Sequence, residues 1–158
     1  MPAAPQPVQS SKVAAISGDA RVPGDKSMSH RAIMFGAMTP GETRITGLLE
    51  GQDVLNTATA MRALGGSVVK GDDGIWRCSG YGVGGLREPA NVIDLGNSGT
   101  SARLLMGLVA GYPFTTMFTG DASLKKRPMK RVITPLEEMG ASFIARRDSK
   151  FPLAVRGN

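Results

Sequence analysis

The sequence is poor in the residues that hold disulfide-rich and metal-binding folds together. It contains one cysteine, Cys78, and one histidine, His30, in 158 residues. A single cysteine excludes an internal disulfide and a multi-cysteine metal site, and a single histidine excludes a histidine-rich metal site. We therefore expect no bound metal, and the low cysteine content suits a reducing, cytoplasmic setting.

Aromatic residues and long hydrophobic runs are scarce as well. Aromatic residues make up 5% of the chain, and no stretch approaches the ~20 consecutive apolar residues that cross a bilayer. The N-terminal residues "MPAAPQPVQSS" lack the apolar segment of a secretory signal. Their Pro, Ala, Gln and Ser content predicts a flexible lead-in over residues 1–11, and we expect no contact with a membrane.

Positive charge exceeds negative charge, with 19 Lys and Arg against 13 Asp and Glu and a net charge of +6. This excess favours an anionic partner. Nucleic-acid-binding proteins usually gather their basic residues and add stacking aromatics. Here the basic residues are dispersed, so nucleic acid is not expected as a partner. The cluster "KKRPMKR" at 125–131 is the exception, and it keeps a non-catalytic, nucleic-acid-binding module open as an alternative.

Apolar residues, 41% of the chain, alternate between helical and strand periodicities. Helices are predicted over residues 27–38, 53–64, 98–110 and 131–140. Strands are predicted at 12–17, 20–22, 42–48, 67–70, 75–79, 91–95, 113–120, 141–147 and 152–157. Gly65 suits the position that ends the second helix, and Pro135 should start or kink the fourth.

The order of these elements repeats along the chain. Residues 24–38 align with residues 96–110, and Gly, Ser, Arg and Met recur at matching places. This predicts an α/β (α+β) fold of two βαβαββ units, over residues 12–84 and 85–158. Helices 27–38 and 98–110 are apolar on nearly all faces beyond their first turn, so we expect them to be buried except at their N-terminal ends.

The starts of these two matching helices carry a pattern that suits anion binding. A helix N-terminus has free N–H groups and a partial positive charge. Ser27 and Arg31 are four residues apart and therefore share a face, and Gly99 and Arg103 repeat this spacing. Lys26 adds a further positive charge. The pattern predicts two neighbouring sites for phosphate or carboxylate groups.

Each of these residues also has a purely structural interpretation. Lys26 could be a surface lysine, Ser27 an N-cap, Arg31 and Arg103 partners in ion pairs, Gly96 and Gly99 turn glycines, and Asp53 and Asp121 caps at helix starts. His30 is expected to be structural rather than catalytic, because no triad partner is apparent near it.

Three motifs in order, "PGDKSMSHRA", "LGNSGTSARLLMG" and "GDASLKKRPM", resemble the 5-enolpyruvylshikimate-3-phosphate synthase family. The resemblance runs from about residue 13 to residue 158 and covers only the N-terminal part of the family's chain. It implies an inverse α/β barrel domain of three βαβαββ units, of which two are present. The strand around 13–21 would belong to the family's other domain, and the remainder of the two-domain enzyme would be missing.

The resemblance also implies an activity. Family members transfer the enolpyruvyl group of phosphoenolpyruvate to shikimate 3-phosphate, a step of aromatic amino-acid biosynthesis that needs no metal or organic cofactor. Glyphosate is the inhibitor associated with the family. The general base would come from the missing C-terminal part, so no catalytic residue is expected in this chain, and the chain alone is expected to lack turnover.

The resemblance assigns eight residues to the substrates: Lys26 to both, Ser27 and Arg31 to shikimate 3-phosphate, Gly99 to phosphoenolpyruvate with Asn97 and Thr100 beside it, Arg127 to the phosphoenolpyruvate phosphate, and Arg103 as a supporting charge. A related alternative is UDP-N-acetylglucosamine enolpyruvyl transferase. That family uses a reactive cysteine in a loop, whereas Cys78 falls in a predicted strand, and "GDKSMSHR" favours the shikimate branch.

Overall fold

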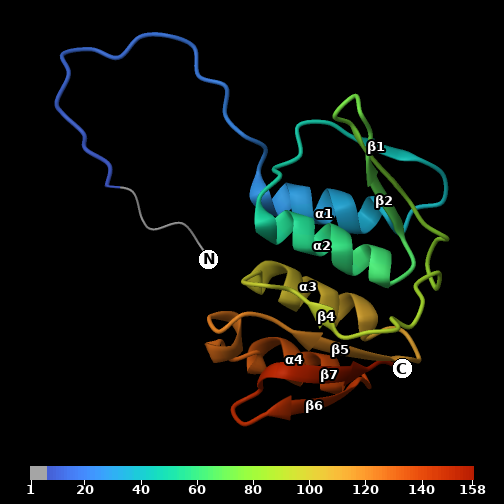
Figure 1. Cartoon of the computed structure of the whole chain (residues 1–158). Coiled ribbons are helices and arrows are strands. Elements are labelled where there is room, and N and C mark those ends of the chain that lie inside the picture. The colour runs from blue at the N-terminus through green and yellow to red at the C-terminus, as the bar shows by residue number, and fades with distance from the viewer. Residues whose placement is uncertain (1–6) are drawn as a thin grey trace.

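The computed structural model describes residues 7–158 (Figure 1). Its elements, in chain order, are α1 (Lys26–Gly36), β1 (Thr43–Ile45), α2 (Gln52–Ala63), β2 (Ser67–Lys70), β3 (Trp76–Ser79), β4 (Ile93–Asp94), α3 (Gly99–Val109), β5 (Thr115–Thr119), the short 3₁₀ helix η1 (Leu124–Lys126), α4 (Lys130–Glu138), β6 (Ser142–Arg146) and β7 (Lys150–Arg156). The predicted mixture of helices and strands is confirmed, and part of the predicted lead-in, residues 1–6, lies outside the described residues.

The first half of the chain forms a three-stranded antiparallel sheet in the order β1-β3-β2, with α1 and α2 packed beside it. Alternation along the strands turns Val68 and Cys78 inward, and both are 1% exposed. A Cβ atom on Gly36 would lie 2.9 Å from Cys78 Cβ, so the glycine lets α1 approach the sheet closely.

The second half forms a four-stranded sheet in the order β4-β5-β7-β6, packed with α3 and α4. β4 is parallel to β5, and the other pairs are antiparallel. This half has the complete predicted βαβαββ order. The first half repeats it from α1 onward, with β1, β3 and β2 in the places of β5, β7 and β6.

The strands predicted at 12–17 and 20–22 do not form. Residues 7–25 contain no helix or strand and are almost entirely exposed (Figure 1). A strand is stable only when a neighbour accepts and donates its backbone hydrogen bonds. No described strand lies beside β1 in the place that β4 occupies beside β5, so the first half has the order α-β-α-β-β.

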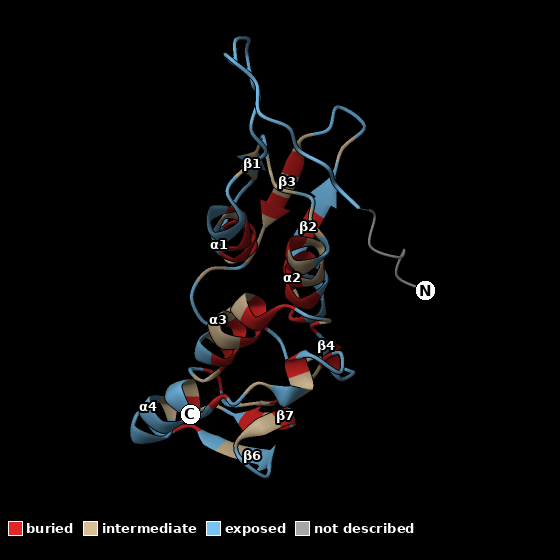
Figure 2. Ribbon diagram, turned by 90° about the vertical axis from the view of Figure 1, so that its left-hand side faces the viewer, coloured by how far each residue is buried: buried red, intermediate tan, exposed pale blue. Residues whose placement is uncertain are grey.

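One apolar core joins the two halves. It runs from the first sheet through Met61 of α2 to Leu105 of α3 and Phe118 of β5, and each of these three side chains is fully buried. Figure 2 shows the buried residues on the facing sides of α1, α2 and α3. The three helices are therefore held as one layer between the two sheets.

The expectation that the first and third predicted helices are buried on nearly all sides is wrong. Met28 and Phe35 of α1 are 71% and 66% exposed. The sides of α1 and α3 that face away from α2 border an apolar groove of about 190 Å³, lined by Arg31, Met34, Phe35, Met38, Leu104 and Leu108. Helix burial depends on neighbours that periodicity alone does not reveal.

The predicted helix boundaries hold to within a few residues, but two details differ. The N-cap of α1 is Asp25, not Ser27. Pro135 lies inside α4 rather than at its start. The prediction for Gly65 is confirmed in its conformation, because it follows α2 with a φ of +94° that other residues rarely adopt.

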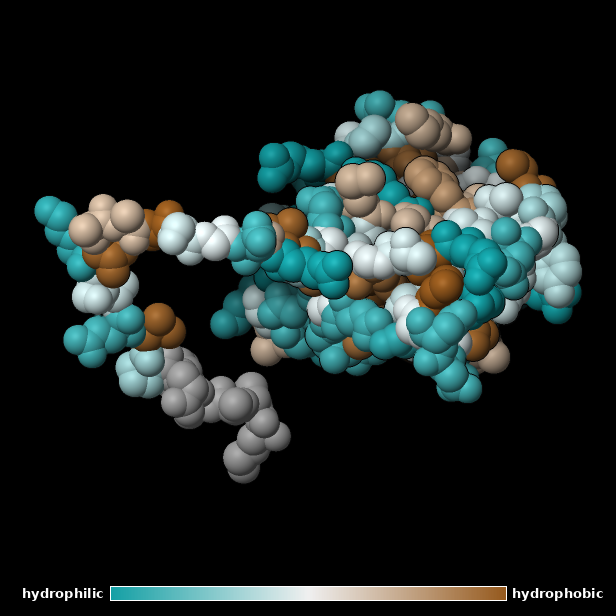
Figure 3. All heavy atoms as spheres, turned by 90° about the horizontal axis from the view of Figure 1, so that it is seen from above, coloured by the Kyte–Doolittle hydropathy of each residue, from teal (hydrophilic) through white to brown (hydrophobic). Residues whose placement is uncertain are grey.

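The surface mixes polar and apolar residues. On the face seen in Figure 3 they are interspersed, and residues 7–25 extend away from the rest of the chain. None of the helices within residues 7–158 has the length and apolar character needed to cross a membrane.

Candidate anion-binding site

The N-terminal ends of α1, α2 and α3 lie at the same edge of the helical layer (Figure 1). Asp25 Oδ1 accepts the N–H of Met28 at 2.7 Å at the start of α1. Ser98 Oγ accepts the N–H of Ser101 at 3.2 Å at the start of α3. Each cap satisfies one of the free N–H donors of its helix. The aligned ends present partial positive charge in one region.

Two arginines repeat the same contact on α1 and α3. Arg31 Nη1 donates to the carbonyl of Ser27 at 3.1 Å, and Arg103 Nη1 donates to the carbonyl of Gly99 at 2.8 Å. Each arginine therefore bends back over the first turn of its own helix. The residues four positions apart therefore lie on the same side of each helix, and the arginine contacts the backbone carbonyl of the earlier residue in both cases.

Gly99 lies beneath two guanidinium groups. A Cβ atom added to it would lie 2.7 Å from Arg127 Nη1 and 2.9 Å from Arg103 Nη1. Arg127 Nη2 donates to Asn97 Oδ1 at 2.6 Å and to Ser123 Oγ at 3.3 Å. The structure thus brings two arginines and the Asn97 amide together over the start of α3, and glycine is the residue that allows their approach.

Asp121 holds this group in place, although the N-cap residue of η1 is Ser123. Its Oδ1 accepts the N–H of Leu124 at 2.7 Å, and its Oδ2 accepts Asn97 Nδ2 at 2.9 Å. The hydrogen bond from Leu124, followed by the contact with Asn97 and the charge of Arg127, lowers the pKa of the Asp121 carboxyl. Because Asp121 takes the amide nitrogen of Asn97, the amide oxygen is directed to Arg127.

Lys26 is paired with a residue that the sequence indicated only as a cap. Lys26 Nζ donates to Asp53 Oδ2, and Asp53 lies in the first turn of α2. The N-cap of α2 is Gly51 instead, and it makes no side-chain capping bond. An acidic residue at a helix start was visible in the sequence, but its pairing with Lys26 depends on how α1 packs against α2.

A buried chain of polar side chains joins the three helices behind this surface. His30 Nδ1 lies 2.7 Å from Thr57 Oγ1, Thr57 Oγ1 lies 2.6 Å from Ser101 Oγ, and Ser101 Oγ lies 2.5 Å from Ser98 Oγ. All four residues are fully buried. Burial lowers the pKa of His30 against the opposing charge of Asp53, so the ring is kept neutral. This supports the structural interpretation of His30.

The eight predicted residues therefore fall into two groups at one edge. Lys26, Ser27 and Arg31 are exposed on α1; Asn97 precedes α3; Gly99, Thr100 and Arg103 lie on α3; and Arg127 follows η1. The half-buried Thr100 makes no side-chain hydrogen bond within residues 7–158. Asp53 lies between the groups, because its carboxylate accepts from Lys26 and its carbonyl accepts from Ser101 Oγ at 3.4 Å.

Comparisons with known proteins identify the family of this chain. Residues 10–158 match the family model of EPSP synthase (3-phosphoshikimate 1-carboxyvinyltransferase). The chain belongs to the EPSP synthase family. It is 62% identical over 152 residues to the 3-phosphoshikimate 1-carboxyvinyltransferase of Paramagnetospirillum magneticum, covering 96% of this chain and 34% of that protein. The protein of the same name from Novosphingobium aromaticivorans is 60% identical over 142 residues, covering 90% and 32%.

A solved structure shows the same arrangement. EPSP synthase from Acinetobacter baumannii superposes with a TM-score of 0.84 at 46% identity, covering 89% of this chain and 32% of that one. The chain therefore spans about a third of the length of the EPSP synthases that it matches. The α/β fold expected from the motifs is confirmed by this likeness.

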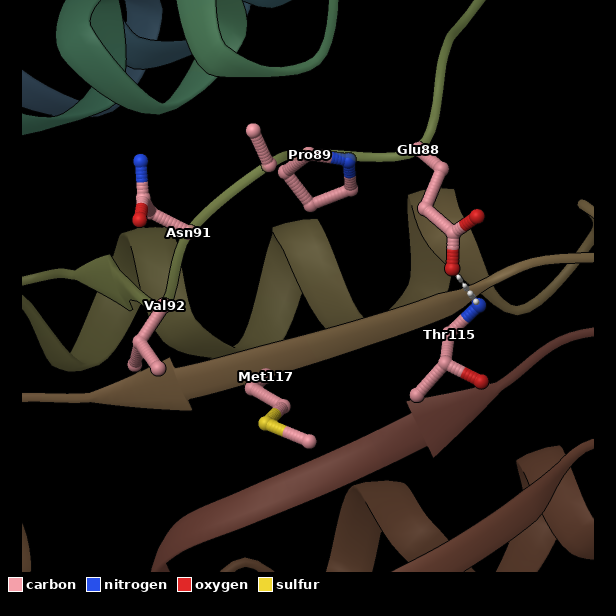
Figure 4. A pocket seen from close by; sticks show the side chains of 7 residues that line it. Glu88, Pro89, Asn91, Val92, Thr115 and Met117 are labelled. Carbon is pink, nitrogen blue, oxygen red and sulfur yellow. Dashed lines mark hydrogen bonds between the residues drawn. The ribbon is translucent and has the colours of Figure 1, made fainter.

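A pocket of about 330 Å³ lies away from the candidate site, between residues 88–92 and β5 (Figure 4). Glu88 Oε1 accepts the backbone N–H of Thr115 across it at 3.3 Å. None of the eight residues that the resemblance to EPSP synthases assigns to the substrates lines this pocket. It therefore has no part in the site built around α1 and α3.

Two features bear on the alternatives to an EPSP synthase. Cys78 is 1% exposed in β3, and burial raises the pKa of its thiol, which is unlike a reactive loop cysteine. The basic cluster 125–131 is interrupted, because Arg127 is held by Asn97 and Met129 is buried. Within residues 7–158, no group of three or more metal-ligating side chains lies close together.

Proposed function

We propose that this chain supplies the α1 and α3 substrate-binding surface of an enzyme that transfers the enolpyruvyl group of phosphoenolpyruvate to shikimate 3-phosphate. The observation that carries the proposal is the convergence of Arg103 and Arg127 over Gly99, beside Lys26 and Arg31 at the same edge. Both substrates are polyanions, and charge-assisted hydrogen bonds from arginine are roughly twice as strong as hydrogen bonds between neutral groups.

In this proposal the two groups of residues divide the substrates. Ser27 and Arg31 bind shikimate 3-phosphate at α1, while Arg127, with Asn97 and Thr100 nearby, binds the phosphate of phosphoenolpyruvate at α3. Lys26 contacts both, and Arg103 adds positive charge. Gly99 has no side chain, so phosphoenolpyruvate can approach the start of α3 closely.

The reaction forms a bond between the 5-hydroxyl oxygen of shikimate 3-phosphate and the C2 carbon of phosphoenolpyruvate. It later breaks the bond between C2 and the phosphate oxygen, which releases phosphate. Positive groups at α3 stabilise the charge of the departing phosphate. Proton transfers to and from the substrates need an acid and a base, and we assign neither to this chain. We therefore propose that the chain alone binds substrate without turnover.

Isothermal titration with shikimate 3-phosphate tests the proposal. Arg31→Ala should weaken binding by about tenfold or more, because a hydrogen bond to a charged group contributes about 1.5–3 kcal/mol. Arg147→Ala is the matched control, since Arg147 is exposed and lies on the turn between β6 and β7. Equal binding by both variants, or no binding by the wild-type chain, would contradict the proposal.

A further inference from the structure

The Asp53 carboxylate is paired with the Lys26 ammonium group, which the proposed function assigns to the substrates. The carboxylate accepts from Lys26 Nζ, with 24% of the Asp53 side chain and 51% of the Lys26 side chain exposed. An incoming phosphate or carboxylate that contacts Lys26 therefore meets a negative charge already in place. The pair joins α1 to α2 across 27 residues of sequence.

The position of Asp53 is fixed by its backbone rather than by its side chain. The Asp53 carbonyl accepts Thr57 Oγ1 at 3.3 Å and Ser101 Oγ at 3.4 Å, and both hydroxyls belong to the buried chain that ends at His30. The carboxylate also lies in the first turn of α2, where the partial positive charge of the helix favours it. The residue is thus anchored between α1 and α3 while its carboxylate faces the site.

Asp121, in the loop between β5 and η1, provides a comparison. Neutral donors, the N–H of Leu124 and the amide of Asn97, hold its two oxygens. Asp53 has no such neutral donor on its carboxylate within residues 7–158, and its one polar side-chain partner there is Lys26. The Asp121 carboxylate is therefore bound into the structure, whereas the Asp53 carboxylate can be exchanged for another anion.

We propose that Asp53 is an internal counterion, a positioning residue that holds the Lys26 ammonium at the site and gives it up when an anionic substrate group binds. This inference rests on the proposed function, which places Lys26 in contact with substrate. The exchange costs affinity, because the Asp53 carboxylate competes with the ligand for the Lys26 ammonium group. In return, the ammonium is already aimed into the site when a doubly charged phosphate arrives and replaces the carboxylate.

The test is a titration of the full chain with inorganic phosphate at low salt. Asp53→Asn keeps the shape of the side chain and removes its charge, so it should tighten phosphate binding about three- to tenfold. Asp53→Glu retains the charge and should bind as the wild type does. In a Lys26→Ala background, Asp53→Asn should change affinity less than twofold, because the effect acts through Lys26.

Asp148→Asn is the matched control for net charge. Asp148 pairs with Lys150 at 3.0 Å on the turn between β6 and β7, and its φ of 62° is one that asparagine tolerates. It should leave phosphate affinity unchanged. Unchanged or weaker binding by Asp53→Asn, an equal effect with and without Lys26, or no phosphate binding by any variant would overturn the inference.

The same titrations separate this inference from the proposed function. If the wild-type chain binds shikimate 3-phosphate but Asp53→Asn leaves phosphate affinity unchanged, only the counterion role is contradicted. If Asp53→Asn tightens phosphate binding only when Lys26 is present, the counterion role is supported. If the chain then binds shikimate 3-phosphate no better than inorganic phosphate, the proposed substrate is contradicted.

Discussion

At the scale of single residues, the candidate site depends on close packing of like charges. Guanidinium nitrogens of Arg103 and Arg127 converge over Gly99, and Asn97 Oδ1 and Ser123 Oγ accept hydrogen bonds that keep Arg127 there. The hydrogen-bond partners of both guanidinium groups within residues 7–158 are neutral oxygens, so their convergence favours an anion between them. The arrangement therefore favours ligand binding over a purely structural role for the arginines.

Replacing Gly99 by alanine tests this arrangement. The new Cβ would lie within 3 Å of both guanidinium groups, which are the flexible ends of long side chains and can move aside. We expect the thermal midpoint to change little and phosphoenolpyruvate affinity to fall about tenfold, the effect of losing one hydrogen bond to a charged group. Isothermal titration of the wild type and of Gly99→Ala measures the affinity, and thermal denaturation measures the midpoint.

Gly107→Ala is the control for Gly99→Ala. It lies in the same helix, α3, and a Cβ atom there would meet nothing within 4 Å. It should raise helix stability by up to about 1 kcal/mol and leave affinity unchanged. Equal affinity in the wild type and Gly99→Ala would show that the arginines over Gly99 do not hold the ligand.

At the scale of secondary-structure elements, the important relation is that between α1, α2 and α3. Their N-terminal ends are aligned by the buried hydroxyl and imidazole groups of Ser98, Ser101, Thr57 and His30. A buried polar chain has few acceptable arrangements, because each unpaired group is costly. It therefore fixes the helices relative to one another more strictly than apolar contacts would.

The buried imidazole makes stability depend on pH. Burial lowers the pKa of His30, so the folded chain keeps the ring neutral while the unfolded chain binds a proton near pH 6.5. This contribution to stability is fully present above that pH and is lost as the pH falls through the folded pKa. Denaturant titrations between about pH 7.5 and pH 5 should show the wild type losing stability on acidification.

His30→Asn is the comparison that isolates this effect. Asparagine can still hydrogen-bond Thr57 but does not titrate. The variant should lose less stability over the same pH interval, whatever its stability at neutral pH. Parallel pH profiles for the two proteins would show that His30 is not the group responsible.

How far the sequence predicts these elements depends on what determines each one. α2 and α3 follow from local apolar spacing, and Arg31 and Arg103 reach their own helix starts because a four-residue spacing fixes that geometry. The pairing of Lys26 with Asp53 depends on helix packing and could not be predicted locally. The prediction of strands within residues 12–22 is wrong, because an alternating apolar pattern does not show whether a neighbouring strand is there to pair with.

At the scale of the whole molecule, the two halves share one core even though their sheets are separate. Buried side chains continue from β3 through α2 and α3 to β5 and β7. Such continuity predicts cooperative unfolding, because neither half can expose its helices without removing the other's packing. The repeat visible in the sequence predicted two similar units but not the layer of helices that joins them.

The single tryptophan allows this cooperativity to be measured. Trp76 lies in β3 of the first half and is 5% exposed, whereas Leu105 is fully buried in α3 of the second half. Leu105→Ala should cost about 2–5 kcal/mol. It should shift the denaturation midpoint reported by Trp76 fluorescence as much as the midpoint reported by far-ultraviolet circular dichroism. An unshifted fluorescence midpoint would show that the halves unfold independently.

The central claim is that the starts of α1 and α3 act as one anion-binding surface. The most direct measurement is a titration of the isotopically labelled chain with shikimate 3-phosphate, followed by the amide resonances of residues 26–31 and 97–103. We expect both segments to shift together, with a single dissociation constant. Two unrelated dissociation constants, or shifts confined to the pocket of residues 88–92 and 115–117, would contradict the claim.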